Sequence, residues 1–264
     1  MITTVLISCL ILGGIVGFLA GLLGIGGGLI IVPALVYLLP MVGVDHEVVM
    51  PMALGTSLGA IVITSTSAAF AHHRNSNIPW LLARKLMSLV ALGALIGAFI
   101  ADSLSREALT GLFSFVVILL AAYMLLSINL SKERTVPPTY ILQTLSFITG
   151  IISSLMGIAG GAILVPSLSF FGVPVLHTIG IATACGVMVA LFGSLGYIIT
   201  GIGTANLPQW SLGYLYLPAL LAIVVSSSIF APLGVKFASK LPIRTLKKCF
   251  AFFLIAVAIK MVLG

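Results

Sequence analysis

Charged residues are scarce in this chain. Only 6% of its 264 residues are Asp, Glu, Lys or Arg, whereas 61% are hydrophobic. Soluble domains carry about 25% charged residues, so a water-soluble fold cannot be covered by this composition. Because a helix that spans a bilayer takes about 20 apolar residues, the chain has room for about ten such elements with short loops. The composition therefore predicts an all-α polytopic membrane protein.

Residues for several kinds of chemistry are also missing. The five acidic residues all fall in or beside expected loops, so the sequence does not contain the buried carboxylate relay of a cation transporter. The three cysteines lack metal-ligand spacing, no G-x-x-x-x-G-K-[ST] loop is present, and no buried Ser/His, Cys/His or carboxylate pair presents itself. We therefore expect no cofactor, no built-in nucleotide motor and no enzymatic activity.

Positive charge exceeds negative charge, with 12 Lys and Arg against 5 Asp and Glu. In a soluble protein this excess would point to nucleic acid, but in a membrane protein it is typical of cytoplasmic loops that face anionic lipid. The lipid bilayer is therefore the expected partner, and nucleic acid is not.

Hydrophobic runs between charge clusters and Pro or Gly punctuation predict ten helical elements. Their ranges are 2–23, 27–39, 49–71, 80–101, 107–128, 139–156, 161–172, 177–200, 211–235 and 244–263. The opening run follows no basic segment, so we expect it to stay as a membrane helix rather than to be a cleaved signal peptide. The most polar stretch divides the ten elements into five and five. We expect a first transmembrane repeat at 1–130, a linker at 131–138 and a second transmembrane repeat at 139–264.

The two halves share an internal repeat. Residues 24–35 (GIGGGLIIVPAL) lie over residues 157–168 (GIAGGAILVPSL) at an offset of 133. Further on, residues 77–80 (NIPW) match residues 206–210 (NLPQW) apart from one inserted residue. Because the order of features is the same in both halves, the chain is predicted to contain a duplicated unit.

The positions of the Lys and Arg residues distinguish two topologies for the glycine-rich segments. If each segment lies inside one continuous span, the loops on the two sides of the membrane hold six positive residues each. If each segment is a hairpin turn, ten lie on one side and only Arg106 and Lys260 on the other, which is the bias expected of cytoplasmic loops. We therefore predict hairpins, a cytoplasmic linker and both termini in the periplasm. Five elements per half is an odd number, so the halves are expected to form inverted-topology repeats, as in many secondary transporters.

The glycine turns are the candidate binding site. A helix hairpin inside the membrane leaves backbone N–H groups unpaired, which is tolerable only where they line a cavity or are packed in protein. Glycine lets a ligand approach the backbone, and the positive N-terminus of the short half-helix that follows suits a small anion. The candidate ligand residues are Gly26, Gly27, Gly28, Gly160 and Gly161. The alternative is that these glycines only allow close helix packing.

Hydroxyl groups on the third element of each half are candidate donors to that anion. Residues 55–57 (GTS) lie over residues 182–184 (ATA), which selects Thr56, Ser57 and Thr183. The alternative is that these hydroxyls bond back to carbonyls of their own helices. At the end of the first of these elements, His72 and His73 either anchor the helix at the interface or attract an anion and sense pH.

These motifs resemble the TauE/SafE (sulfite exporter) family of membrane permeases. The resemblance rests on residues 24–35, their repeat at 157–168, and the stretches at 55–57 and 72–80. It implies a multi-pass carrier of a bacterial or archaeal inner membrane that moves sulfite, sulfonates or related sulfur-containing anions. One departure is Ala159, which stands where the first copy has Gly26 and is expected to hold a ligand further from the second turn.

The expected function is that of a secondary transporter of small oxyanions. Two glycine-turn half-helices would form a site at the membrane midplane, and the two halves would rock around it. A function of another class is also open: a non-transporting membrane scaffold or subunit whose repeat is purely structural.

Overall fold

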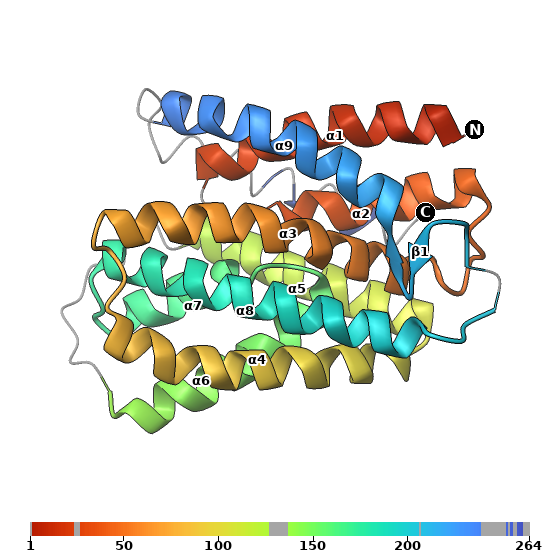
Figure 1. Ribbon diagram of the computed structural model, residues 1–264. Coiled ribbons are helices and arrows are strands. Elements are labelled where there is room, and N and C mark those ends of the chain that lie inside the picture. Colours follow the sequence, from red (N-terminus) through yellow and green to blue (C-terminus); the bar gives the residue numbers. More distant parts are fainter. Residues whose placement is uncertain are drawn as a thin grey trace.

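The computed structural model describes the chain from its first helix to the end of its ninth, with gaps at residues 24–26, 127–136 and 206. The described residues are 2–23, 27–126, 137–205, 207–238, 252, 254–255 and 258–260. They form an all-α protein with one two-stranded hairpin (Figure 1). The α-helices are α1 Ile2–Leu23, α2 Gly28–Leu38, α3 Val49–Arg74, α4 Trp80–Asp102, α5 Arg106–Leu126, α6 Thr139–Met156, α7 Gly161–Phe170, α8 Val175–Gly201 and α9 Leu217–Ala238. A 3₁₀-helix, η1, spans Leu39–Val42, and the strands are β1 Ser211–Leu212 and β2 Leu215–Tyr216.

The first nine predicted elements are confirmed as helices, but the start of the ninth is wrong. The sequence predicts a helix from residue 211, whereas residues 211–216 form the antiparallel pair of β1 and β2 and the helix begins at Leu217. The positive φ angles of Trp210 (68°) and Gly213 (55°) bend the chain here, because neither conformation can continue a right-handed helix. The predicted tenth element, 244–263, lies largely outside the described residues.

Several helices are suited to a bilayer. Five described helices are long and apolar enough to cross a membrane, namely α3, α4, α5, α6 and α8. In water these surfaces would be costly, because large apolar side chains such as Leu81 and Phe115 are exposed on them. The chain is therefore a multi-pass membrane protein.

The helices pack in pairs that correspond between the two halves. α1 lies along α9, and α4 lies along α6 (Figure 1). Likewise α2 packs against α3, and α7 packs against α8. The element order matches each of α1–α4 to the corresponding helix of α6–α9. With this matching, the α1–α9 pair corresponds to the α6–α4 pair, and the α2–α3 pair corresponds to the α7–α8 pair.

Close approach of these helices depends on glycine. A Cβ on Gly17 of α1 would collide with the backbone of Ser227 in α9, and a Cβ on Gly150 of α6 would collide with the carbonyl oxygen of Val90 in α4. Gly17 and Gly150 occupy the same position of the repeat. Close packing is therefore the role of these two glycines.

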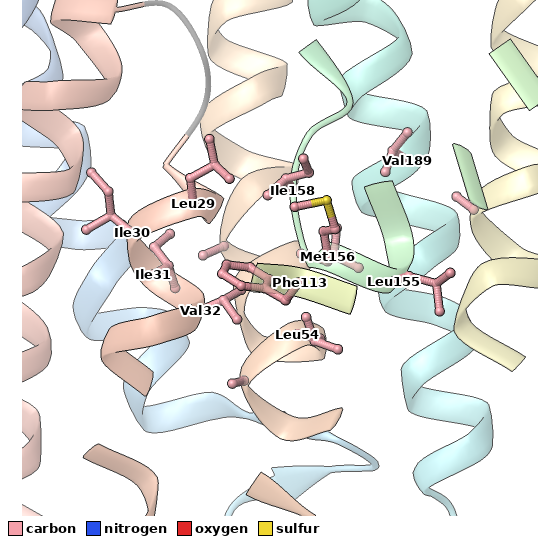
Figure 2. Close-up of a cluster of buried hydrophobic side chains, with 14 of the residues drawn as sticks. Leu29, Ile30, Ile31, Val32, Leu54, Phe113, Leu155, Met156, Ile158 and Val189 are labelled. Atoms are coloured by element: carbon pink, nitrogen blue, oxygen red, sulfur yellow. The ribbon is translucent and has the colours of Figure 1, made fainter. Parts of the chain in front are cut away.

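The core lies around the first half of α3. Every residue of α3 from Val49 to Ile61 is buried. Figure 2 shows the neighbouring cluster, in which side chains of α2, α3, α5 and α8 surround the end of α6 and the residues that follow it. Its labelled members are Leu29, Ile30, Ile31, Val32, Leu54, Phe113, Leu155, Met156, Ile158 and Val189. This core holds both short helices, α2 and α7, against the long ones.

Candidate functional site

Both glycine-rich segments link a long helix to a short one, but their backbones differ. In the first segment, residues 24–26, and with them the predicted site residue Gly26, lie outside the described part of the chain. Gly27 precedes α2 with φ −76°, an ordinary right-handed value. In the second segment, Gly157 (φ +63°) ends α6 and Gly160 (φ +73°) precedes α7, both in the left-handed region that favours glycine. Conformation therefore requires glycine at positions 157 and 160, but not at 27.

Packing is what requires glycine at the first turn. A Cβ on Gly27 would collide with Cγ1 of Val16 in α1. A Cβ on Gly28 would collide with the carbonyl oxygen of Gly157 and would lie 3.0 Å from the Cα of Ile158. The start of α2 is thus in direct contact with the second glycine turn. In Figure 2, Leu29 of α2 and Ile158 of that turn lie close together in one cluster.

A side chain of α3 also holds the second glycine turn at Gly157. The hydroxyl of Ser57, which is fully buried, donates a hydrogen bond of 2.8 Å to the carbonyl oxygen of Gly157. The end of α6 is closed by two backbone bonds, from the Gly157 N–H to the Ser154 carbonyl (3.2 Å) and from the Ile158 N–H to the Ser153 carbonyl (3.0 Å). Such bonds are typical of a helix that ends on a left-handed glycine. The second turn is therefore held by α3 as well as by its own helix.

The two short helices differ in how their N-termini are covered. At α2, Gly28 and Leu29 are buried in the core. The backbone pattern is the same at both helices: the Gly27 carbonyl accepts the N–H groups of Ile30 and Ile31 (both 3.0 Å), and the Gly160 carbonyl accepts those of Ile163 (3.0 Å) and Leu164 (2.8 Å). The N–H groups of the first two helical residues, Gly161 and Ala162 in α7 as well as Gly28 and Leu29 in α2, have no hydrogen-bond partner among the described residues.

Gly161 is also the more open position. It is only half-buried, and apart from its chain neighbours and the backbone of its own helix no atom of the described residues lies within 4 Å of the position that a Cβ would occupy. Unpaired N–H groups at the start of a helix attract an anion, because the helix dipole is positive there. The start of α7 is therefore more open than the start of α2.

The three predicted hydroxyl donors are engaged in this structure. Thr56 Oγ1 accepts the N–H of Tyr216 in β2 (2.9 Å), and Ser57 bonds to Gly157. Thr183 Oγ1 lies within hydrogen-bond distance of the carbonyls of Gly180 (2.9 Å) and Ile179 (3.1 Å) in its own helix. Back-bonding is thus seen for Thr183, whereas Thr56 and Ser57 join distant segments. The role of all three as ligand donors stays a prediction.

Two buried hydroxyls that are not among the predicted site residues have no hydrogen-bond partner among the described residues. Ser153 and Ser154, in the last turn of α6, are fully buried, and neither Oγ has a hydrogen-bond partner among the described residues. The repeat contains a signal for them, because the equivalent residues of the first half are Ala20 and Gly21. Hydroxyl-bearing serines therefore replace Ala and Gly in the last turn of the helix that leads into the second glycine turn.

The His-His stretch ties the end of α3 to the start of α4. Trp80 Nε1 donates a hydrogen bond to His73 Nδ1 (3.1 Å), and Asn77 Nδ2 donates to His72 Nδ1 (3.3 Å). A Cβ on Gly180 of α8 would collide with the Asn77 carbonyl oxygen, so this turn packs directly on α8. These contacts support the anchoring role.

Polar contacts also gather at the opposite end of the bundle. The Tyr214 hydroxyl donates to Asp102 Oδ1 (3.1 Å) and accepts a hydrogen bond from Thr204 (3.3 Å). Burial raises the pKa of Tyr214 above its ordinary value, so the phenol stays protonated and able to donate. Arg106 donates to His46 Nε2 (3.0 Å) at an exposed position. Asp102 is the last residue of α4, as the placement of acids beside loops predicts.

Two surface grooves lie apart from the glycine turns. One of about 500 Å³ is lined by α4 and α8, with Arg84 among its lining residues. The other, of about 590 Å³, is lined by Trp210, Tyr216 and their neighbours. None of the predicted site residues that the structure describes lines either groove. Among the described residues, no three His, Cys, Asp or Glu side chains gather where they could hold a metal ion.

Comparison with known proteins gives a consistent result. The profile of the family described as "Sulfite exporter TauE/SafE" matches residues 9–261. A Haemophilus influenzae protein named "Probable membrane transporter protein" is 42% identical over 261 residues, which cover 98% of this chain and 99% of that protein. A similarly named protein of Methanocaldococcus jannaschii is 29% identical over 90% of this chain and 88% of its own length. One from Bacillus subtilis is 26% identical over 72% of this chain and 77% of its own length. No solved structure matches the chain.

Proposed function

Because this chain belongs to the TauE/SafE sulfite exporter family, we propose that this membrane transporter is a secondary carrier of small sulfur-containing oxyanions across the inner membrane. Sulfite is the substrate that the family description names, and simple sulfonates are the related anions that the proposal includes. Its energy would come from an ion gradient or from the substrate gradient, because the sequence holds no nucleotide-binding loop.

The observation that carries this proposal is the contact between the two glycine turns. Gly28, at the start of α2, touches Gly157, three residues before the N-cap of α7. Two half-helices from opposite halves of the chain therefore begin near one point in the core. Each contributes a positive helix end, so the point favours negative charge without a cationic side chain.

The absence of charge around this point also supports a transported anion. The described residues include buried hydroxyl side chains but no buried Lys, Arg, Asp or Glu. Amide and hydroxyl donors hold an anion less tightly than a buried Arg would, and they avoid the cost of a charge in the membrane. A carrier needs such reversible binding, because the substrate must leave on the other side.

The correspondence of helix-packing pairs between the two halves supports an inverted repeat. If α1–α5 correspond to the second five elements in opposite orientation, then α1 with α9 and α4 with α6 are equivalent interfaces. Rocking of one half against the other would open the central point to each side in turn.

Transport measurements in proteoliposomes test the proposal. We expect protein-dependent flux of radiolabelled sulfite, compared with empty liposomes, and a change in that flux when a pH gradient is imposed. Chloride and sulfate are the comparison anions. The absence of protein-dependent flux for every sulfur anion tested would contradict the proposal and favour the scaffold alternative. So would equal thermal stabilisation of the purified protein by sulfite and chloride, because a specific ligand stabilises the state that it binds.

A further inference from the structure

The hydroxyl of Ser153 in α6 makes no hydrogen bond that stabilises the described structure. The residue is fully buried, and its Oγ is unpaired among the described residues. Earlier in the same helix, Ser146 bonds back to the Leu142 carbonyl (2.8 Å) and Thr149 bonds back to the Leu145 carbonyl (2.8 Å). Such back-bonding is how a buried hydroxyl in a membrane helix is usually satisfied. Ser153 does not adopt it, although an unpaired buried hydroxyl is costly.

The Ser153 hydroxyl faces the start of α7. Its Oγ lies 3.2 Å from the position that a Cβ on Gly160 would occupy. Methyl groups of Thr149 and Val189 lie 3.6 Å and 3.5 Å from the same position and form apolar walls. Because Gly160 has no side chain, nothing of its own separates this hydroxyl from the N-cap of the short helix. The next two residues, Gly161 and Ala162, carry the unpaired N–H groups of α7.

We propose that the Ser153 hydroxyl and the N–H groups of Gly161 and Ala162 form a binding subsite for one oxyanion of the transported substrate. The subsite deepens the proposed function and rests on it. Two of its three groups can only donate hydrogen bonds, and the third donates readily, so the subsite favours a deprotonated oxyanion over a neutral acid. The positive end of the α7 dipole adds to this preference.

The subsite belongs to the second half alone. The residue equivalent to Ser153 in the first half is Ala20, which has no hydroxyl, and the start of α2 is covered by the core. The duplication is therefore functionally asymmetric, with one half supplying a hydroxyl donor and the other supplying the packing surface at Gly28.

Binding at this subsite requires a movement of the second turn. The Ser153 hydroxyl is inaccessible in this structure, whereas Gly161 is half-exposed. Gly157 and Gly160 flank the turn at positive φ, where glycine permits rotations that other residues resist. We expect the oxyanion to reach the hydroxyl when this turn shifts away from α6, so the structure corresponds to a closed state of the subsite.

The test compares two adjacent serines. Ser153→Ala and Ser154→Ala each remove one unpaired, fully buried hydroxyl, but Ser154 lies near Gly97 of α4 and Gly193 of α8 rather than at the start of α7. Sulfite affinity is measured by calorimetry on the full-length purified protein, and folding is followed by the melting temperature. We expect Ser153→Ala to weaken sulfite binding by about 10- to 100-fold, the effect of losing a hydrogen bond to a charged group. Ser154→Ala is expected to change the affinity by less than about threefold, and neither variant should have a lower melting temperature than the wild-type protein.

The other outcomes separate the subsite from the transport function. Equal affinities in wild type and Ser153→Ala would overturn the subsite while leaving sulfite binding intact. Equal losses in the two variants would overturn it as well, because they would mark a structural role shared by both serines. If wild-type protein neither binds nor transports sulfite, the proposed function fails and the subsite fails with it. Ser153→Cys keeps the shape with a weaker donor, so it should show an intermediate affinity if Ser153→Ala does not fold.

Discussion

Ser57 of α3 is hydrogen-bonded to Gly157, which lies 100 residues further along the chain, with 2.8 Å between the Ser57 hydroxyl and the Gly157 carbonyl oxygen. The preceding residue, Thr56, accepts the N–H of Tyr216 in the hairpin before α9. Two consecutive residues of the most buried part of α3 therefore hold the second glycine turn and the hairpin. Any movement of the turn that opens the start of α7 must either break the Ser57 bond or carry α3 with it.

Removal of the Ser57 hydroxyl should lower stability. In Ser57→Ala the buried Gly157 carbonyl loses its side-chain donor, which costs about 1–3 kcal/mol. Thermal unfolding in detergent measures the change as a lower melting temperature. Thr66→Ala is the control, because the exposed Thr66 hydroxyl bonds only to the Val62 carbonyl of its own helix (2.6 Å). Equal melting temperatures for the two variants would show that the Ser57 bond contributes nothing to stability.

The neighbouring threonines should differ in the same way. Thr56→Val removes the acceptor of a buried N–H, that of Tyr216, so we expect a destabilisation of about 1–3 kcal/mol. Thr183→Val removes a hydroxyl that bonds only within α8, and we expect less than about 0.5 kcal/mol. Chemical or thermal unfolding of both variants checks the difference. Because Thr183→Val should fold normally, its sulfite affinity also tests the predicted ligand role of Thr183 directly.

Most helices are predictable from the sequence because a bilayer forces a simple pattern. Each span must be a continuous apolar run, and polar or glycine-rich segments mark its ends. The hairpin at 211–216 is not predictable in this way, since no charged residue separates it from the apolar helix that follows. Its turn depends on Gly213, where a Cβ would collide with the Ile198 carbonyl of α8. That contact is tertiary and leaves no local signal.

The candidate site is only partly predictable for a related reason. Repetition of the glycine motif identifies the two turns, because a duplicated backbone requirement is visible in the letters. The reason for each glycine is not visible: Gly27 is required by the side chain of Val16, whereas Gly160 is required by its own φ angle. The free hydroxyl of Ser153 is also hidden, because back-bonding predicts that it should be satisfied within α6.

The link between Tyr214 and Asp102 should stabilise the hairpin end of the bundle over a wide pH range. Tyr214→Phe removes the phenol hydroxyl and should cost about 1 kcal/mol or more. Because burial raises the pKa of Tyr214, the phenol's contribution is fully present below the unfolded value of about 10 and is lost as the pH rises through the folded value. Melting temperatures of wild type and Tyr214→Phe should therefore differ by a constant amount from about pH 6 to 9 and converge at higher pH. Tyr140→Phe, at an exposed tyrosine of α6, should not change the melting temperature. A difference that already vanishes near pH 7 would contradict the assignment.

The charge distribution makes a definite prediction about topology. The starts of α1 and α6 lie at opposite ends of the bundle (Figure 1). Under the hairpin topology, ten of the twelve Lys and Arg residues fall on the side where α6 starts, so we expect that side to face the cytoplasm. Reporter fusions should place residue 1 and residue 264 outside and residues 132–138 inside. A periplasmic linker would overturn the inverted-repeat proposal.

The two glycine turns should respond differently to alanine and similarly to aspartate. Gly160→Ala places a Cβ at a φ of +73° and should cost about 1–2 kcal/mol of strain, whereas Gly27→Ala has no φ penalty and presses mainly on Val16. Adding Val16→Ala should therefore relieve Gly27→Ala, but it should not relieve Gly160→Ala. Melting temperatures of the single and double variants measure this difference.

Aspartate at either turn tests the site rather than the packing. Gly27→Asp and Gly160→Asp each place a carboxylate at the start of a half-helix, where a bound anion would be repelled by like charge. We expect sulfite affinity per folded molecule to fall by at least tenfold in both variants, and Gly27→Ala measures any loss through packing at the first turn. Calorimetry on monodisperse protein separates affinity from the fraction folded. If folded Gly27→Asp binds sulfite as wild type does, the start of α2 has no part in the site; the same result for Gly160→Asp would remove α7, and with it the basis for an anion between the turns.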